Sequence, residues 1–202
     1  MNNENENSAE EISATEDLMR EHGVLNRILL IYEEGLRRLR TDKEVSPEVF
    51  HATAALVRKF VEDYHEKLEE TYIFPEFEKQ KKLTDLVATL RSQHQAGRNI
   101  TDLILRNAVT DRFVKKDARR EILRSCEAFI RMYRPHEARE DTVLFPALRK
   151  IIPAKQIDEL GERFEEKEHH LFGEEGFAQT VEEVAKIEKQ LDIHDLVQFT
   201  AK

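Results

Sequence analysis

Two segments of the chain carry the same arrangement of histidine and glutamate, two residue types that bind metal ions. Residues 65–75 read HEKLEETYIFP and residues 136–146 read HEAREDTVLFP, so the histidine, both matching glutamates, the threonine and the Phe-Pro pair recur at an offset of 71 (65 against 136). A lone histidine precedes each segment at an offset of 72 (His22 against His94). The chain therefore contains a duplicated unit of one histidine followed by a His-x-x-x-Glu motif.

The spacing within each motif places its two side chains on one face of a helix, because residues four apart are about 6 Å apart along the axis. These residues also fall on apolar stripes, so we expect them to face the interior of a helical bundle. Left unpaired there, imidazoles and carboxylates would each cost several kcal/mol. A pair of iron or manganese ions about 3.5–4 Å apart, bridged by carboxylates, would satisfy them; a buried polar network without metal is the alternative. The candidate metal ligands are His22, His65, Glu69, His94, His136 and Glu140.

Helical periodicity of apolar residues predicts the elements that must position these side chains. Four long helices are expected, with apolar stripes over residues 18–39, 50–72, 83–104 and 122–143. Ser46 and Pro47 should begin the second, and Phe-Pro pairs should close the second near 74–75 and the fourth near 145–146. Pro135 predicts a kink or local widening within the fourth.

The predicted fold class is all-α, an up-down-up-down four-helix bundle with an additional C-terminal helical segment. We expect an acidic, disordered tail at residues 1–13, the bundle at 14–150 and a helical appendage at 151–202 packed on the bundle. In the appendage, helices are expected at about 154–171, ended by Gly173, and at about 177–191.

Composition excludes several other classes of function. The net charge of −9 makes a nucleic-acid-binding surface improbable. No apolar run approaches the roughly 20 residues that cross a bilayer, so no membrane association is expected. A single cysteine, Cys126, forms no internal disulfide and favours a reducing compartment. These features predict a cytoplasmic protein.

The order of the six candidate ligands resembles the hemerythrin-like, or HHE cation-binding, family over about residues 14–150. The resemblance implies a four-helix bundle with a non-haem di-iron centre: two iron ions, with manganese or a mixed metal pair as alternatives. It implies that the four histidines are terminal nitrogen ligands and that Glu69 and Glu140 are bridging carboxylates.

The chain departs from the oxygen-carrying members of that family in two places. Those proteins have a fifth histidine on the third helix, where this chain has Arg98, and they use a His-x-x-x-x-Asp motif on the last helix, which Asp141 could supply. The internal repeat favours Glu140 because it matches Glu69, and Asp141 is the alternative. The resulting set is more similar to the hemerythrin-like domains of iron sensors and of iron–sulfur cluster repair proteins.

Glutamates and tyrosines beside the candidate ligands each have two possible roles. Glu66 and Glu137 could accept hydrogen bonds from the ligands or become additional ligands when the metal state changes. Alternatively, they lie about 100° round the helix, solvated or paired with an arginine or lysine. The ligand-flanking tyrosines, Tyr64 and Tyr133 among them, could bond a small oxidant, although core packing is the expected role.

Two histidines and the single cysteine lie outside the predicted ligand turns. His169 and His170 could form a second metal site or cover the bundle, with a solvated face as the expected outcome. Cys126 should be a small buried thiol.

The leading hypothesis is a protein that binds or senses O₂ or a related small oxidant at the iron pair. Its expected partner is a small diatomic or peroxide ligand, and no protein partner is indicated. The second hypothesis is a di-iron oxidoreductase acting on peroxide or nitric oxide, or a protein of iron–sulfur cluster repair. The third is an interaction module that the buried metal only stabilises.

Overall fold

The computed structural model describes residues 12–201 and consists of helices joined by short connections, as predicted. The first bundle helix is α1 (Ala14–Arg40) and the third is α5 (Thr84–Asn107). The second is continuous over five pieces, α2 (Pro47–Leu56), η1 (Val57–His65), α3 (Glu66–Leu68), η2 (Glu69–Ile73) and α4 (Phe74–Gln80). After the short α6 (Thr110–Phe113), the fourth runs through α7 (Lys116–Arg139), η3 (Glu140–Leu144) and α8 (Phe145–Ile151).

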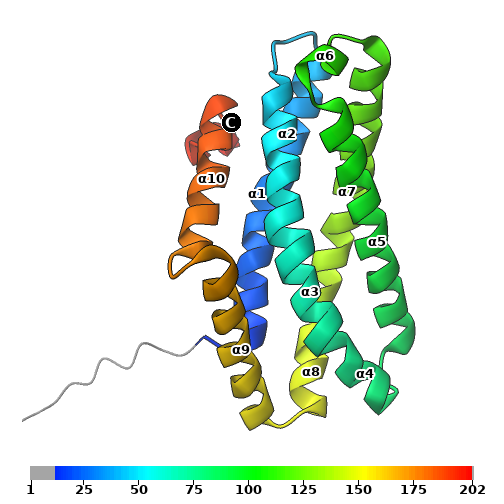
Figure 1. Ribbon diagram of the computed structural model, residues 1–202, viewed down its shortest axis with the longest axis vertical. Helices are drawn as coiled ribbons and strands as arrows, with labels where there is room; N and C mark the ends of the chain where they lie inside the picture. Colours follow the sequence, from blue (N-terminus) through cyan, green and yellow to red (C-terminus); the bar gives the residue numbers. More distant parts are fainter. Residues whose placement is uncertain (1–11, 202) are drawn as a thin grey trace, which may run out of the picture.

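The four long helices run side by side in alternating directions, with α6 capping one end (Figure 1). Beyond them, α9 (Ala154–Phe172) and α10 (Gly176–Gln190) lie against α1, and α10 also contacts α2. A 3₁₀ turn, η4 (Leu196–Phe199), follows α10. No β-strand occurs between residues 12 and 201, which confirms the all-α class. Residues 1–11 of the predicted tail lie outside the described residues.

Local sequence signals account for where the helices begin. The Ser46 side chain accepts a hydrogen bond from the Glu48 N–H at 3.2 Å, and Pro47 occupies the first turn, as predicted. Ser13 caps α1, and its backbone N–H donates to the Glu16 carboxylate at 3.1 Å. Gly173 ends α9 with a φ of 82°, a conformation that few other residues adopt.

Both Phe-Pro pairs behave differently from the prediction, because neither ends its helix. The second bundle helix continues to Gln80 and the fourth to Ile151. A wide π turn precedes each proline: the Phe74 N–H bonds to the Glu69 carbonyl and the Phe145 N–H to the Glu140 carbonyl, each five residues back. A proline ring collides with the carbonyl four residues earlier in an ordinary α-helix. The wide turn avoids that collision and lets the helix continue.

The kink or wide helical turn expected at Pro135 is not found there, and a wide turn occurs five residues later. Pro135 lies inside α7, which stays α-helical to Arg139, and the wide turn begins at Glu140. The candidate ligands Glu69 and Glu140 are therefore the first residues of the two matching π turns, which occupy equivalent positions in the duplicated units.

In the part of the chain that the structure describes, no helix is long and apolar enough to cross a membrane. The bundle interior is instead built from buried aromatic and aliphatic side chains of every long helix, among them Tyr32, Phe60, Phe129 and Phe145. The buried histidines and glutamates of the duplicated motifs interrupt this core.

Gly97 lets two helices approach closely beside these polar residues. A Cβ atom at this position of α5 would overlap the Tyr133 hydroxyl and lie 2.8 Å from Tyr133 Cζ. Gly23 on α1, by contrast, has no atom within 4 Å of the place where its Cβ would be.

We expect Gly97→Ala to destabilise the protein by about 1–3 kcal/mol, because the methyl group overpacks the contact with Tyr133. Gly23→Ala is the matched control and should stabilise the protein by about 0.5–1 kcal/mol, since alanine favours an exposed helical position. Chemical unfolding of the two variants measures both values. Equal effects at the two glycines would contradict the close approach of α5 to α7.

Candidate metal centre

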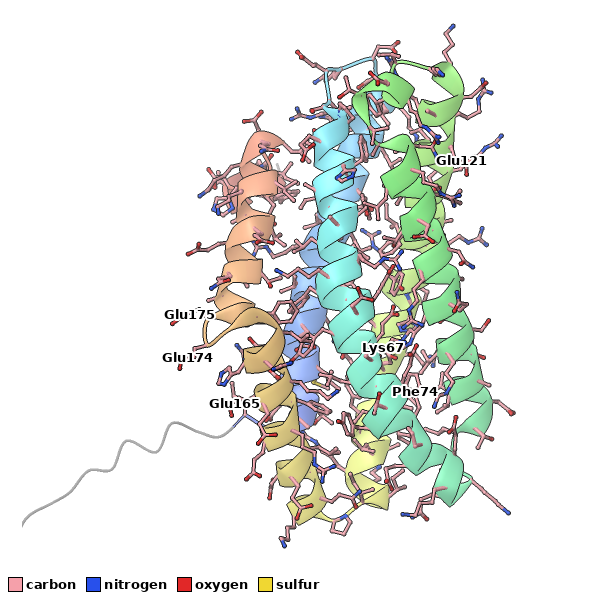
Figure 2. All side chains as sticks on the ribbon, in the orientation of Figure 1. Lys67, Phe74, Glu121, Glu165, Glu174 and Glu175 are labelled. Atoms are coloured by element: carbon pink, nitrogen blue, oxygen red, sulfur yellow. The ribbon has the colours of Figure 1, made fainter. Side chains whose placement is uncertain are left out.

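The structure brings all six candidate ligands together in the bundle interior. His22 comes from α1 and His94 from α5, while the other four come from the two helices with π turns. Their exposed fractions are 4% or less. In Figure 2 the labelled Lys67, between His65 and Glu69 in the sequence, marks the level of this cluster along the second helix, and the labelled Phe74 directly follows the π turn that begins at Glu69.

The four histidines form two pairs, each with its Nε2 atoms facing. The Nε2 atoms of His22 and His65 are 3.1 Å apart, and those of His94 and His136 are 3.2 Å apart. One member of each pair comes from the first histidine of a duplicated unit and the other from its His-x-x-x-Glu motif.

Each glutamate lies between the two histidine pairs. Glu140 Oε2 is 3.4 Å from His22 Nε2 and 3.2 Å from His136 Nε2. Glu69 Oε1 is 3.8 Å from His65 Nε2, and its Oε2 is 3.4 Å from His94 Nε2. Both carboxylates thus contact one histidine of each pair, which is the arrangement that a bridging carboxylate requires.

The Nδ1 atom of every histidine faces an oxygen acceptor. His22 pairs with Asp141 at 2.7 Å and His94 with Glu70 at 3.1 Å. The other two acceptors are Glu21, 2.5 Å from His65 Nδ1, and the amide oxygen of Gln93, 2.8 Å from His136 Nδ1. An Nδ1–H that donates to such an acceptor fixes the ring and leaves Nε2 with its lone pair, the form that binds metal.

With Nε2 deprotonated, as metal binding requires, the interior of the cluster has no protons to share. Neither oxygen of Glu69 and neither oxygen of Glu140 has a hydrogen-bond partner. Facing lone pairs and orphaned carboxylate oxygens in a buried site are costly. Cations between them would remove that cost, and nitrogen plus carboxylate donors suit iron or manganese. The residues present therefore fit a pair of metal ions.

The pKa values around the cluster reflect burial and the close charges. Burial lowers the pKa of His65 well below its usual value, and that of His94 also falls for this reason. Burial acts in the same direction on His22, but its hydrogen bond to Asp141 and the adjacent carboxylate of Glu140 outweigh it and raise its pKa to about 10. Burial, together with the charge of Glu140, raises the pKa of Glu69 well above its usual range.

Glu66 and Glu137 are buried, so neither is solvated, but the expected pairing with an arginine is found for Glu66. The Tyr133 hydroxyl donates to Glu66 Oε1 at 2.6 Å, and Arg98 lies 2.7 Å from Glu66 Oε2. Arg98 also bonds Glu70 at 2.7 Å, so the residue that stands in place of a fifth histidine connects two carboxylates beside the cluster. Burial raises the pKa of Glu137 to about 7.

Sequence reasoning missed three of the four Nδ1 acceptors. Glu21 and Gln93 directly precede His22 and His94, and Glu70 directly follows Glu69. The signal that would have found them is the repeat itself, because it matches Glu21 with Gln93 and Glu70 with Asp141. Asp141 was considered as a ligand, but it lies on the Nδ1 side of His22, away from the facing Nε2 atoms.

None of the remaining residues that the sequence singled out is placed among the six candidate ligands. His169 and His170 are exposed on α9, in agreement with the solvated reading, and His169 lies 3.9 Å from Glu165. Cys126 is fully buried, as expected. Tyr64 and Tyr133 are core residues, with the hydroxyl of Tyr133 bonded to Glu66.

Comparison with known proteins gives relatives without an assigned activity. An uncharacterized protein of Mycobacterium bovis and one of Mycobacterium tuberculosis are each 50% identical to this chain over 189 residues, which cover 94% of this chain and 74% of the relative. No solved structure matches the chain.

The sequence profile of the hemerythrin HHE cation binding domain matches residues 13–112 and again residues 85–200. The two matches cover the duplicated units and reach into the appended helices. Together with the convergence of four histidines and two glutamates, this match shows that the chain belongs to the hemerythrin HHE cation-binding family.

Proposed function

We propose that the protein holds two iron ions between its histidine pairs and binds or senses O₂ or a related small oxidant there. The observation that carries the proposal is the set of four inward Nε2 atoms and four orphaned carboxylate oxygens at one buried point. His22 and His65 would hold one ion, His94 and His136 the other. Glu69 and Glu140 would bridge them.

The protein residues prepare this site in three ways. The Nδ1 hydrogen bonds fix the orientation of each imidazole, so that its Nε2 atom faces the position of the ions. The surrounding aromatic core, including the ring of Phe145 that stacks on His22 at 5.7 Å, excludes bulk water. Bound iron would supply reversible one-electron chemistry and coordination positions that the six ligands leave free.

The burial of the cluster favours a ligand of a few atoms. With every candidate ligand at most 4% exposed, a large organic substrate has no surface from which to reach the ions. This observation supports O₂, peroxide or nitric oxide as the species that interacts with the site. In the leading hypothesis the protein binds this small molecule, and in the alternative it reduces it.

Removal of a bridging carboxylate should release metal. We expect the wild-type chain to hold two iron ions and Glu140→Ala to lose at least one. The loss should lower the free energy of unfolding by about 3 kcal/mol, the stabilisation given by a ligand present at about 100 times its Kd. Metal analysis after gel filtration, with thermal unfolding, measures both.

Two control variants make this result specific. Asp141→Asn should keep two ions, because Asp141 contacts only the Nδ1 side of His22. Glu165→Ala, at an exposed position that Figure 2 labels on the outer side of α9, should change neither quantity. A full metal complement in Glu140→Ala would show that Glu140 is not a ligand. If that variant keeps both ions while Asp141→Asn loses one, Asp141 is the ligand instead.

Metal affinity should rise with pH, because His22 carries a proton that the metal must displace. Its pKa of about 10 keeps it protonated from pH 6.5 to 8.5 in the metal-free protein, so affinity should increase about tenfold per pH unit for this proton. Asp141→Asn replaces the carboxylate that helps to raise this pKa with a neutral amide acceptor, so the metal affinity of the variant should depend less steeply on pH. Anaerobic competition between the protein and a chelator for Fe²⁺ gives the slopes; equal slopes would contradict the role of Asp141.

Spectroscopy under controlled oxidation separates the candidate functions. Iron-loaded protein purified in air should absorb in the near ultraviolet, lose this absorption on reduction and regain it on exposure to air. A stable, repeatable cycle supports binding or sensing. Consumption of many equivalents of peroxide or nitric oxide supports the oxidoreductase, and a spectrum that does not respond leaves only a structural role for the metal.

A further inference from the structure

The two halves of the centre share one geometry but differ in charge. The duplication relates His22 to His94 and His65 to His136, and it relates their Nδ1 acceptors as well. We propose that the two metal positions are unequal and that the Glu21/Gln93 difference makes the His22–His65 position the tighter and more electron-rich one. This inference rests on the proposed function, because it concerns the same pair of ions.

Two carboxylates support the His22–His65 position. Glu21 accepts from His65 and is 2% exposed, and Asp141 accepts from His22. Within residues 12–201, neither carboxylate forms an ion pair with a lysine or an arginine. No lysine or arginine therefore offsets these two carboxylates. Burial raises the pKa of Glu21 above its usual range, and a cation held between the histidines would favour its ionised form.

The His94–His136 position has a different environment. Its acceptors are the neutral amide of Gln93 and the carboxylate of Glu70. Glu70 is bonded by two cations, Arg98 at 2.7 Å and Lys67 at 2.6 Å. Little net negative charge therefore lies behind these two imidazoles.

The repeat shows that this difference comes from individual substitutions between the units. The position of Arg98 in the other unit is Asn26, at the offset of 72, and the position of Lys67 is Ala138, at the offset of 71. Neither replacement carries a charge. Asp141 consequently lacks both of the cations that neutralise its counterpart Glu70.

A carboxylate behind Nδ1–H makes the imidazole a stronger donor at Nε2, and loss of such a partner typically costs about 10–100-fold in metal affinity. Uncompensated negative charge also favours the more positive oxidation state of a nearby ion. The His22–His65 position should therefore fill first and, with iron, be oxidised first. The other position should hold the more labile ion, which is the better candidate for exchange with a small ligand.

Zn²⁺ titration of the full chain tests the first part, because this ion is redox-inert and can be followed at each histidine. One equivalent should shift the imidazole NMR signals of His22 and His65 before those of the other pair. Chelator competition should then give two affinities at least about tenfold apart.

Exchange of the two acceptors provides the decisive comparison. Glu21→Gln should weaken the first binding step by about 10–100-fold and leave the second nearly unchanged, while Gln93→Glu should tighten the second. Gln95→Glu is the matched control, because it adds the same charge to an exposed position of α5. In iron-loaded protein, Gln93→Glu should also narrow the gap between the two reduction potentials, which a structural role alone would not change. The unfolding midpoint of each variant shows that it is folded.

The outcomes distinguish this inference from the proposed function. A wild-type chain that binds fewer than two ions contradicts the proposed function. Two ions bound with equal affinity, or one equivalent of Zn²⁺ distributed over both histidine pairs, overturn only the inequality. Equal effects of Gln93→Glu and Gln95→Glu on the second step would overturn the role of the acceptor.

Discussion

Four imidazole rings with their Nε2 atoms turned inward are the constraint around which the bundle is organised. Each ring is held by an oxygen acceptor at Nδ1, and each acceptor directly precedes or follows a candidate ligand in sequence. Because the rings are fixed from behind, their Nε2 atoms face the oxygens of Glu69 and Glu140 in two adjoining groups that share Glu69. The charge of a metal pair is what such an arrangement can accommodate in an apolar interior.

The helical scaffold is adapted to this arrangement at equivalent places in both units. A π turn begins at each of Glu69 and Glu140 and ends before a Phe-Pro pair, so these buried side chains stay on the interior face while the helix continues past the proline. The phenylalanine rings that precede the prolines stack on ligand histidines, Phe145 on His22 and Phe74 on His94. The π turn, the phenylalanine that stacks on a histidine and the following proline thus form one local unit, which occurs once in each half of the duplication.

The duplication is preserved in geometry and altered in charge. Glu21 matches Gln93, Asn26 matches Arg98, and Ala138 matches Lys67. These differences leave the positions of the imidazoles nearly symmetric but place them in unlike electrostatic environments. This charge difference is the basis of the proposed inequality of the two metal positions. It leaves the packing of the imidazoles unchanged, because charges interact over longer distances than the contacts that determine packing.

The sequence alone determined the helical class, the four long helices and the six residues that meet at the centre, because helical periodicity and a duplicated motif are local patterns. It did not determine that the helices continue beyond Pro75 and Pro146, since the wide turns depend on the backbone geometry of the packed bundle. Nor did it settle whether Glu66 is solvated. Only the tertiary structure brought Arg98 and Tyr133 to it from other helices, and which residues face each other between helices is fixed by packing and not by spacing along one chain.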